Sequence, residues 1–334
     1  MSKINGPIRL LVTEATTSPF ARHVRDWADT SLMELAFPPD SAPESLVKLA
    51  PECEALLCYQ ALVSAALINA APHLRFIQKH GLNCRNIALD AARERGIPVA
   101  TQPLIRNITV AEHALGLMLA CSRKLITGHQ TVTEAGYAAM GLAPMLTSQT
   151  HYRANWAGIT GMVELYRATA GIVGMGDIGI EIAKRCRVFG MNLVYHQRTR
   201  LDHATETDLN LSYAGLDELL ATADFVMLAL PHTPQTEGLI NARTLALMKP
   251  TATLINMGRG GLVDEAALAH ALQFGQIAMA ALDVYQREPL PANSPLLKLP
   301  NVVLTPHLGG GSYRSWEMDM PASLANIQNY FAGT

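Results

Sequence analysis

Three ionisable residues, far apart in the chain, could together bind and protonate a carbonyl compound. Arg259, Glu288 and His307 each come soon after a short apolar run that predicts a strand. The carboxyl ends of parallel strands meet at one edge of a sheet, so we expect these side chains to face one region. Arginine can hold a carboxylate and polarise a carbonyl, and histidine can donate a proton near neutral pH. A carboxylate bonded to that histidine favours its protonated form. Taken singly, each has an ordinary alternative: a surface arginine, a turn glutamate and a capping histidine.

The stretch from Thr169 to Gly179 predicts where a nucleotide binds. It reads strand, glycine-rich turn and helix, and the run from Asn192 to His196 closes a βαβ unit. In such a unit the first glycine permits a tight turn, the second lets the backbone approach a pyrophosphate, and the third allows close helix packing. The helix N-terminus offers N–H groups to the phosphates. We therefore predict dinucleotide binding at Gly174, Met175, Gly176, Asp177, Ile178 and Gly179. Arg259, Glu288 and His307 beside a dinucleotide domain favour hydride transfer with a proton relay.

The residues after the second strand of this unit indicate which dinucleotide is used. Sites for NAD place a carboxylate here for the ribose 2′-hydroxyl, whereas sites for NADP omit it and supply arginine. This chain has Gln197, Arg198, Thr199 and Arg200 at that position. A guanidinium pairs with a phosphate dianion that a carboxylate would repel. We predict a preference for NADP(H), with NAD(H) as the other cofactor; the alternative is that both arginines are merely solvated.

Two runs of alternating strands and helices must position these residues. The first half predicts strands at 8–12, 33–35, 55–58, 76–77 and 98–100, with helices near 20–29, 44–49 and 87–95. The second predicts six strands, at 171–173, 192–196, 225–230, 252–256, 277–284 and 302–305. Between the halves, Thr109 could cap an apolar helix over 110–123, and a helical tail over 313–331 should pack back on the first half. This order predicts an α/β fold of doubly wound parallel sheets, with a nucleotide domain at 106–305 inserted in a domain of 1–105 and 306–334.

Composition excludes several other classes of protein. The 334 residues are 49% apolar and 16% charged, which is typical of a globular chain. A net charge of −2 gives no reason to expect nucleic acid or a membrane surface as a partner. The five cysteines form no CxxC pair, and we expect small buried residues of a reducing compartment and no metal site. Without an apolar leader or spanning segment, a cytoplasmic protein is expected.

Several motifs in order resemble those of the D-isomer-specific 2-hydroxyacid dehydrogenase family, over nearly the whole chain. They are the glycine loop, Val110-Ala111-Glu112-His113, Leu230-Pro231-His232-Thr233-Pro234-Gln235-Thr236, Asn256-Met257-Gly258-Arg259-Gly260-Gly261-Leu262-Val263-Asp264, Asp283-Val284 with Glu288-Pro289, and Pro306-His307. The resemblance implies Rossmann-like and flavodoxin-like domains and reduction of a small 2-keto acid to the D-2-hydroxy acid. It also implies a homodimer, formed through the long helix and the residues after it.

The resemblance implies a role for each candidate residue. Arg259 would bind the keto acid, His307 would protonate the ketone oxygen, and Glu288 would support His307. Asp283 would bond the nicotinamide carboxamide, and the backbone at Gly81–Leu82 would hold the substrate carboxylate. Further cofactor contacts are expected at Thr109, Pro231, His232, Thr236, Met257 and Gly258.

Three departures from the family pattern bear on the substrate. Asn83 and Arg85 replace a glycine and an aspartate of the substrate loop, and Arg106 stands where asparagine is common and could reach an extra anionic group. The segment 127–168, which lacks clear periodicity, is longer than usual. Glyoxylate and hydroxypyruvate are the generic substrates expected. The alternatives are a formate-type enzyme, which Glu288 argues against, a phosphite-type enzyme, and a nucleotide-sensing corepressor that keeps the same triad.

Overall fold

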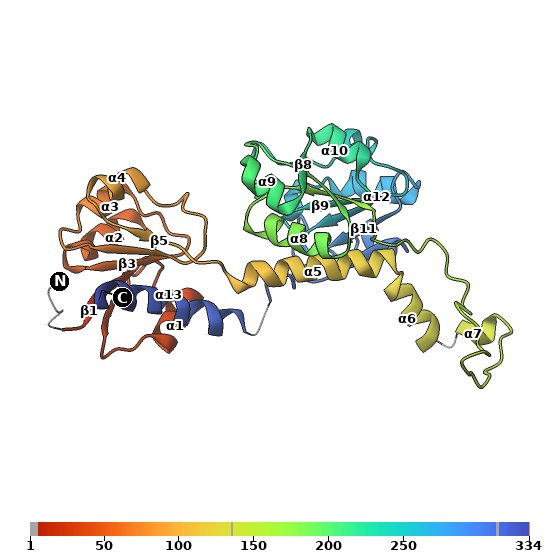
Figure 1. The fold of residues 1–334 in the computed structure, drawn as a ribbon, viewed down its shortest axis with the longest axis horizontal. Coiled ribbons are helices and arrows are strands. Elements are labelled where there is room, and N and C mark those ends of the chain that lie inside the picture. The colour runs from red at the N-terminus through yellow and green to blue at the C-terminus, as the bar shows by residue number, and fades with distance from the viewer. Residues whose placement is uncertain (1–5, 135, 312–313, 334) are drawn as a thin grey trace. The chain divides into compact units, whose positions relative to one another are not determined.

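The chain folds into two compact units. The computed structural model describes residues 6–134, 136–311 and 314–333. One unit comprises Met1–Arg106 and Ser312–Thr334, and the other comprises Asn107–Gly311 (Figure 1). The second crossover therefore lies after Gly311 and not after the predicted residue 305. His307 accordingly belongs to the same unit as the glycine loop, because Asp283 of that unit bonds the backbone of residues 307–309.

The first unit is built on a five-stranded parallel sheet. The strands are β1(Ile8–Val12), β2(Met33–Ala36), β3(Ala55–Cys58), β4(Phe76–Lys79) and β5(Val99–Ala100). Their order in the sheet is β2-β1-β3-β4-β5. β3 and β4 are buried along their whole length, as expected of central strands covered by helices on both faces.

Helices cover both faces of this sheet. They are α1(Pro19–Trp27), α2(Pro43–Leu49), α3(Ala65–Asn69), α4(Leu89–Glu94) and the C-terminal α13(Ser315–Ala332), with a 3₁₀ turn at Ala50–Glu52. The predicted packing of the tail on the first half is confirmed, since α13 contacts α1 and β4. Met320, Leu324 and Ile327 enter the core beside Leu10 and Val12. Tyr313, where the tail was predicted to begin, lies outside the described residues.

The second unit contains a seven-stranded parallel sheet. Its strands are β6(Thr169–Val173), β7(Asn192–His196), β8(Leu211–Tyr213), β9(Phe225–Leu228), β10(Thr253–Asn256), β11(Met279–Leu282) and β12(Val302–Leu304). The order β12-β11-β10-β9-β6-β7-β8 reverses direction at β6, which is the doubly wound topology that binds nucleotides at the switch point. The prediction of six strands was wrong by one. The missed edge strand β8 buries only Leu211, too short an apolar signal to detect.

Eight helices complete the described part of the second unit. They are α5(Ile105–Ser122), which begins in the first unit, α6(Leu125–Thr133), α7(Gly136–Ala139), α8(Asp177–Val188), α9(His203–Leu209), α10(Leu216–Thr222), α11(Ala242–Leu245) and α12(Glu265–Gln273), with 3₁₀ turns at Gly260–Leu262 and Pro295–Lys298. The prediction that Thr109 caps a helix was wrong, because α5 starts four residues earlier. There the N–H of Ile105 donates to the carboxylate of Asp319 at 2.9 Å.

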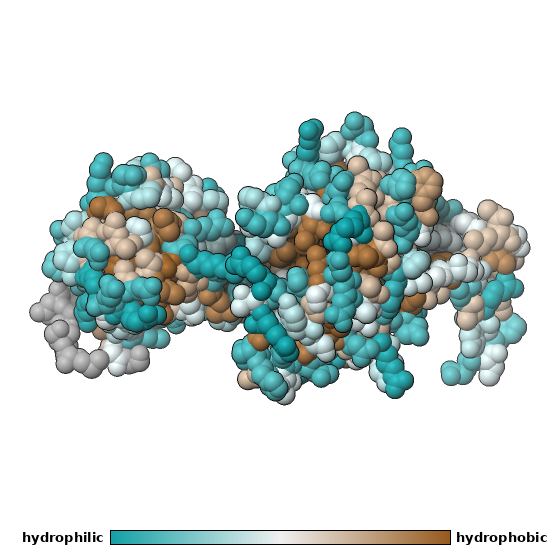
Figure 2. Space-filling model, turned by 90° about the horizontal axis from the view of Figure 1, so that it is seen from above, coloured by the Kyte–Doolittle hydropathy of each residue, from teal (hydrophilic) through white to brown (hydrophobic). Residues whose placement is uncertain are grey.

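The segment after α5 leaves many apolar side chains at the surface. Leu125, Val132 and Leu146 expose 52%, 59% and 96% of their area. In Figure 2 brown apolar atoms appear among the teal polar ones on the visible face. Surface patches of this kind mark interaction sites more often than isolated apolar residues do. No helix in the described residues is long and apolar enough to cross a membrane.

Candidate active site

The turn between β6 and α8 has room for a phosphate at one glycine and none at the other two. Gly174 has φ of +97°, and a Cβ there would lie 2.7 Å from the carbonyl oxygen of Ala229. A Cβ on Gly179 would lie 2.1 Å from the carbonyl oxygen of Gly174. A Cβ on Gly176 would meet nothing within 4 Å. The loop therefore has the tight turn, the open approach and the close helix contact that a bound pyrophosphate requires.

The N-terminus of α8 faces this loop without a side-chain cap. Gly176 occupies the N-cap position, where no side-chain hydrogen bond satisfies the first N–H groups of the helix. Asp177 and Ile178 follow in the first turn, and Asp177 Oδ2 accepts from Asn107 Nδ2 at 3.2 Å. Met175 is buried at 4% exposure. A helix N-terminus capped by glycine and the helix dipole together suit an anion, so these residues fit a dinucleotide.

The loop after β7 differs from the prediction at one arginine. Arg200 donates from Nε and Nη2 to the carboxylate of Glu206 at 2.8 and 2.9 Å, so its guanidinium is bound to the following helix, α9. Tyr195 also donates to Glu206, at 2.6 Å. The hydrogen bonds from Arg200 and Tyr195 hold the pKa of Glu206 at about 2.

The other two polar side chains of this loop differ in their bonding. Gln197 accepts from the N–H of Met175 at 3.3 Å and donates to the Thr199 carbonyl at 2.6 Å. Arg198 is exposed. Within the described residues Arg198 forms no hydrogen bond or ion pair, which leaves its guanidinium available to a ligand.

The turns after β9 and β10 lie beside the glycine loop, because β10, β9 and β6 are neighbours in the sheet. After β9, the Thr236 hydroxyl donates to the Pro231 carbonyl at 2.9 Å and accepts from the Thr233 N–H at 2.8 Å. His232 contacts Glu237. After β10, Met257 is buried, and a Cβ on Gly258 would lie 2.8 Å from the Leu230 carbonyl oxygen. The predicted cofactor residues that follow β6, β7, β9 and β10 thus gather on the carboxyl edge of one sheet, whereas Thr109 lies within α5.

Glu288 and His307 form a hydrogen-bonded pair. His307 Nδ1 lies 2.6 Å from Glu288 Oε2, and Glu288 Oε1 accepts from the Tyr285 N–H at 3.1 Å. Burial alone raises the pKa of Glu288, but these two hydrogen bonds and the charge of Arg259 outweigh it and hold the pKa below 4.5. Both side chains reach the surface, with 46% of His307 and 36% of Glu288 exposed.

Arg259 follows β10 and is exposed. Its Nη1 donates to the Gly258 carbonyl at 2.8 Å, the one hydrogen bond that its guanidinium makes within the described residues. Its positive charge adds a small contribution to the lowered pKa of Glu288. The structure therefore brings the three residues predicted to act on the substrate to one edge of the second unit.

Asp283, which follows β11, is buried and hydrogen-bonded within the second unit. Its side chain is 2% exposed. Its oxygens accept from Thr305 Oγ1 at 2.6 Å and from the N–H groups of Leu308 and Gly309 at 2.8 Å. His113 Nε2 lies 3.2 Å from the same carboxylate. Thr305, Leu308 and Gly309 therefore hold a buried Asp283 carboxylate at the edge of the sheet, and its bond to the nicotinamide carboxamide stays a prediction.

The predicted substrate residues of the first unit lie after β4 and at the start of α5. Gly81 has φ of +114° and Leu82 is 43% exposed. Arg106 contacts the Tyr59 hydroxyl and sits over its ring, 5.1 Å from the centroid. Sequence reasoning missed Tyr59 here and Glu206 and Thr305 in the second unit, and it gave His113 no role beyond its place in a motif. Their only signal was position after a strand or in a helix, which does not show what a side chain contacts.

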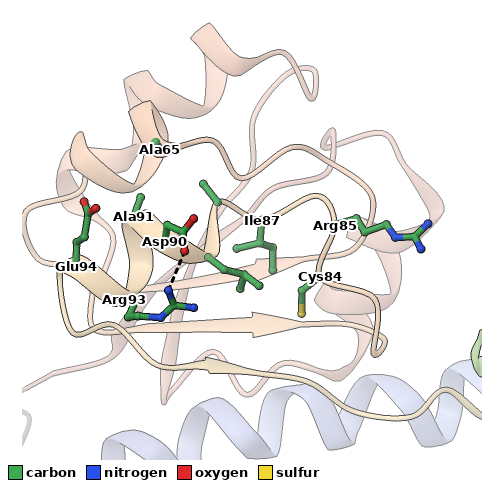
Figure 3. Close-up of a pocket in the computed structure, with 10 residues that line it drawn as sticks. Ala65, Cys84, Arg85, Ile87, Asp90, Ala91, Arg93 and Glu94 are labelled. Atoms are coloured by element: carbon green, nitrogen blue, oxygen red, sulfur yellow. Dashed lines mark hydrogen bonds and ion pairs between the residues drawn. The ribbon is translucent and has the colours of Figure 1, made fainter. Parts of the chain in front are cut away.

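A surface hollow in the first unit holds none of the predicted site residues. It lies between α3 and α4 and includes Cys84 and Arg85 from the loop after β4. Figure 3 shows Arg85 pointing away from the other labelled residues, and Arg93 joined to Asp90, whose atoms are 2.8 Å apart. Arg259, Glu288 and His307 do not line this hollow.

Comparison with known sequences identifies the family. The family model for the D-isomer specific 2-hydroxyacid dehydrogenase NAD binding domain matches residues 115–309. A glyoxylate reductase from Pyrococcus furiosus is 40% identical over 247 residues, which cover 74% of this chain and 70% of that protein. A D-3-phosphoglycerate dehydrogenase from Archaeoglobus fulgidus is 36% identical over 307 residues, or 91% of this chain. This chain spans only 54% of the length of that dehydrogenase.

Solved structures share the two-unit fold. A protein from Pyrococcus horikoshii OT3 has a TM-score of 0.69 at 27% identity, covering 96% of this chain and 91% of its own. An NADPH-dependent glyoxylate/hydroxypyruvate reductase from Sinorhizobium meliloti has a TM-score of 0.66 at 27% identity, covering 97% and 94%. The predicted architecture of two parallel-sheet α/β domains is confirmed. The chain belongs to the D-isomer-specific 2-hydroxyacid dehydrogenase family.

Proposed function

We propose that the protein reduces a small 2-keto acid to the D-2-hydroxy acid with a reduced nicotinamide dinucleotide. The observation that carries this is the His307–Glu288 pair at 2.6 Å, on the same sheet edge as Arg259 and the glycine loop. The glyoxylate reductases among its relatives support glyoxylate and hydroxypyruvate as the substrates to test first.

Each residue of the site has a distinct task in this reaction. The dinucleotide, when bound, supplies the hydride. Arg259 binds the substrate carboxylate and polarises the neighbouring ketone. His307 gives its proton from Nε2 to the ketone oxygen, since Nδ1 is bonded to Glu288. The negative charge of Glu288 stabilises the imidazolium before that proton leaves.

We propose NADP(H) as the preferred cofactor. Gln197 stands where a carboxylate would repel a 2′-phosphate, and Arg198 has a free guanidinium beside it. The name of the Sinorhizobium meliloti reductase, which is NADPH-dependent, supports this choice. Arg200 is bound to Glu206 and is not assigned to the phosphate.

In the first unit, we propose that the backbone around Gly81 and Leu82 binds the substrate carboxylate. Arg106, placed against Tyr59 in the same unit, is the proposed contact for any further anionic group on the substrate. A dicarboxylic 2-keto acid compared with a monocarboxylic one of equal length would show whether Arg106 has this effect.

We also propose a homodimer formed through α6 and the residues that follow it. The support is the number of exposed apolar side chains in this segment, among them Leu125, Val132 and Leu146. Their burial in a partner surface would remove apolar area from water. Light scattering of the L125S/V132S variant should report a smaller mass than wild type; equal masses would refute this interface.

The chirality of the product tests the proposed reaction. The protein is incubated with NADPH and hydroxypyruvate, and the 2-hydroxy acid is separated on a chiral column. We expect the D isomer alone. The L isomer, or no 2-hydroxy acid from any 2-keto acid tested, would refute the proposal.

A further inference from the structure

We propose that Asp283 is a positioning residue for His307, and that Thr305 and His113 hold Asp283 in place. This inference rests on the proposed function, because it concerns the residue assigned as proton donor. All four residues lie in the second unit: His113 on α5, Asp283 just after β11, and Thr305 and His307 just after β12. β11 and β12 are parallel neighbours, so their carboxyl ends lie side by side.

Asp283 bonds three consecutive N–H groups of the backbone that carries the proton donor. The His307 N–H donates to the Asp283 carbonyl oxygen at 2.9 Å. The next two N–H groups, of Leu308 and Gly309, donate to the Asp283 carboxylate at 2.8 Å each. Successive N–H groups around a left-handed residue form a concavity that binds an anion. Here the anion is a buried side chain of the same chain, and the left-handed residue is His307, with φ of +56°.

Thr305 and His113 fix the orientation of this carboxylate from the opposite side. The Thr305 hydroxyl donates to Asp283 Oδ1 at 2.6 Å. His113 Nε2 lies 3.0 Å from the Thr305 hydroxyl oxygen and 3.2 Å from Asp283 Oδ1. Because the hydroxyl proton is given to Asp283 and a carboxylate only accepts, Nε2 of His113 must carry a proton. The network therefore connects α5 to the segment that holds His307.

The conformation of His307 depends on this network. A left-handed backbone is disfavoured for a residue with a Cβ and persists where the surroundings determine it. Packing also restricts the backbone after His307. Gly309 fits closely against its neighbours, since a Cβ there would lie 2.8 Å from Met257 Cε and 3.1 Å from Asp283 Oδ2. When the carboxylate loses its orientation, His307 is free to rotate away from Glu288. Protonation of the ketone then slows, whereas the glycine loop and dinucleotide binding are unaffected.

The test compares Thr305→Val with Thr305→Ser. Valine keeps the shape of threonine without the hydroxyl, and serine restores the hydroxyl. In T305V we expect kcat to fall about 10- to 100-fold, the size that follows from misplacing a catalytic group by about 1 Å. The dissociation constant of NADPH, followed by its fluorescence, should stay at the wild-type value in both variants. Thr222→Val is the matched control, since Thr222 is an exposed residue whose hydroxyl bonds only within α10.

His113→Leu and His113→Gln repeat the comparison from the α5 side, with glutamine keeping a donor near the position of Nε2. Wild-type kcat in T305V and H113L would overturn the inference. A loss that serine and glutamine do not restore would also overturn it. So would an NADPH dissociation constant that rises as far as kcat falls, because Asp283 would then act on the cofactor. His307→Asn separates the two proposals: no turnover of any 2-keto acid by the wild-type protein removes the proposed function, normal turnover in H307N removes the proton-donor role of His307, and loss of turnover in H307N with normal T305V and H113L removes only the positioning role.

Discussion

Nδ1 of His307 lies 2.6 Å from Oε2 of Glu288, and this contact sets which ring nitrogen is left for the substrate. Glu288 is itself held by the Tyr285 N–H at 3.1 Å, so the carboxylate has a fixed partner on each oxygen. With Nδ1 engaged, Nε2 is the nitrogen available to a carbonyl oxygen. The pair therefore orients a proton donor at the edge of the sheet where the glycine loop also lies.

His307→Asn should abolish most turnover and leave cofactor binding intact. Asparagine is the suitable replacement because it tolerates the left-handed backbone found at this position. Loss of a positioned acid lowers kcat by about 10²- to 10⁴-fold. Steady-state kinetics and NADPH fluorescence titration check the two quantities separately. Wild-type kcat in this variant would remove His307 from the reaction.

Glu288→Gln should lower kcat and change the acid side of its pH profile. The hydrogen bonds from His307 and Tyr285 hold the pKa of Glu288 below 4.5 against the opposing effect of burial. A carboxylate with a lowered pKa keeps its interaction above that pKa and loses it as the pH falls through it. Wild-type activity should therefore persist in mildly acidic solution and decline only at a pH below the usual titration range of a glutamate, and E288Q should lack this decline. Superimposable profiles for the two proteins would contradict the assigned role.

Arg198→Ala should weaken NADPH binding and leave NADH binding unchanged. The expected loss is about 10- to 100-fold, from ~1.5–3 kcal/mol for a hydrogen bond to a charged group. Arg243→Ala is the control, because Arg243 on α11 is an exposed arginine paired with Asp217 on α10. Equal losses for both cofactors in R198A would show that Arg198 does not contact the 2′-phosphate.

Gly176→Ala should fold normally and bind the dinucleotide poorly. Gly176 has φ of −80°, which alanine adopts, and the Cβ of an alanine there would meet no atom within 4 Å. Replacing glycine at such a position stabilises a protein by about 0.4–1 kcal/mol. The added methyl group nevertheless occupies the space through which a pyrophosphate approaches the backbone. Thermal unfolding and NADPH titration measure these effects, with Gly215→Ala, another glycine with open space around it, as the control. Wild-type affinity in G176A would place the phosphates elsewhere.

The sheet could be predicted from the sequence because apolar periodicity alone locates buried strands. β1, β3 and β7 begin and end at the predicted residues. Edge strand β8 was missed because Ser212 and Tyr213 face solvent. The start of α5 was predicted too late, at Thr109. The N–H of Ile105 at the true start donates to the carboxylate of Asp319, which lies more than 200 residues further along the chain. Such a contact has no local sequence signal.

The candidate site was predictable only in part, for the same physical reason. Position after a strand located Glu288 and His307 on one sheet edge, and the structure pairs them. It could not show that Asp283 points inward, since that depends on the left-handed backbone at His307. Nor could it separate Arg198 from Arg200, because the carboxylate of Glu206, on the following helix, determines which guanidinium is free.

The most direct test of the account is the oxidation of NADPH by the wild-type protein when a 2-keto acid is added. Absorbance of the reduced nicotinamide is followed with glyoxylate, hydroxypyruvate, pyruvate, a branched and an aromatic 2-keto acid, and the series is repeated with NADH. The account predicts turnover of at least one small acid, faster with NADPH than with NADH at equal concentration. Absence of turnover with every acid and both cofactors, in protein shown to bind NADPH, would contradict it.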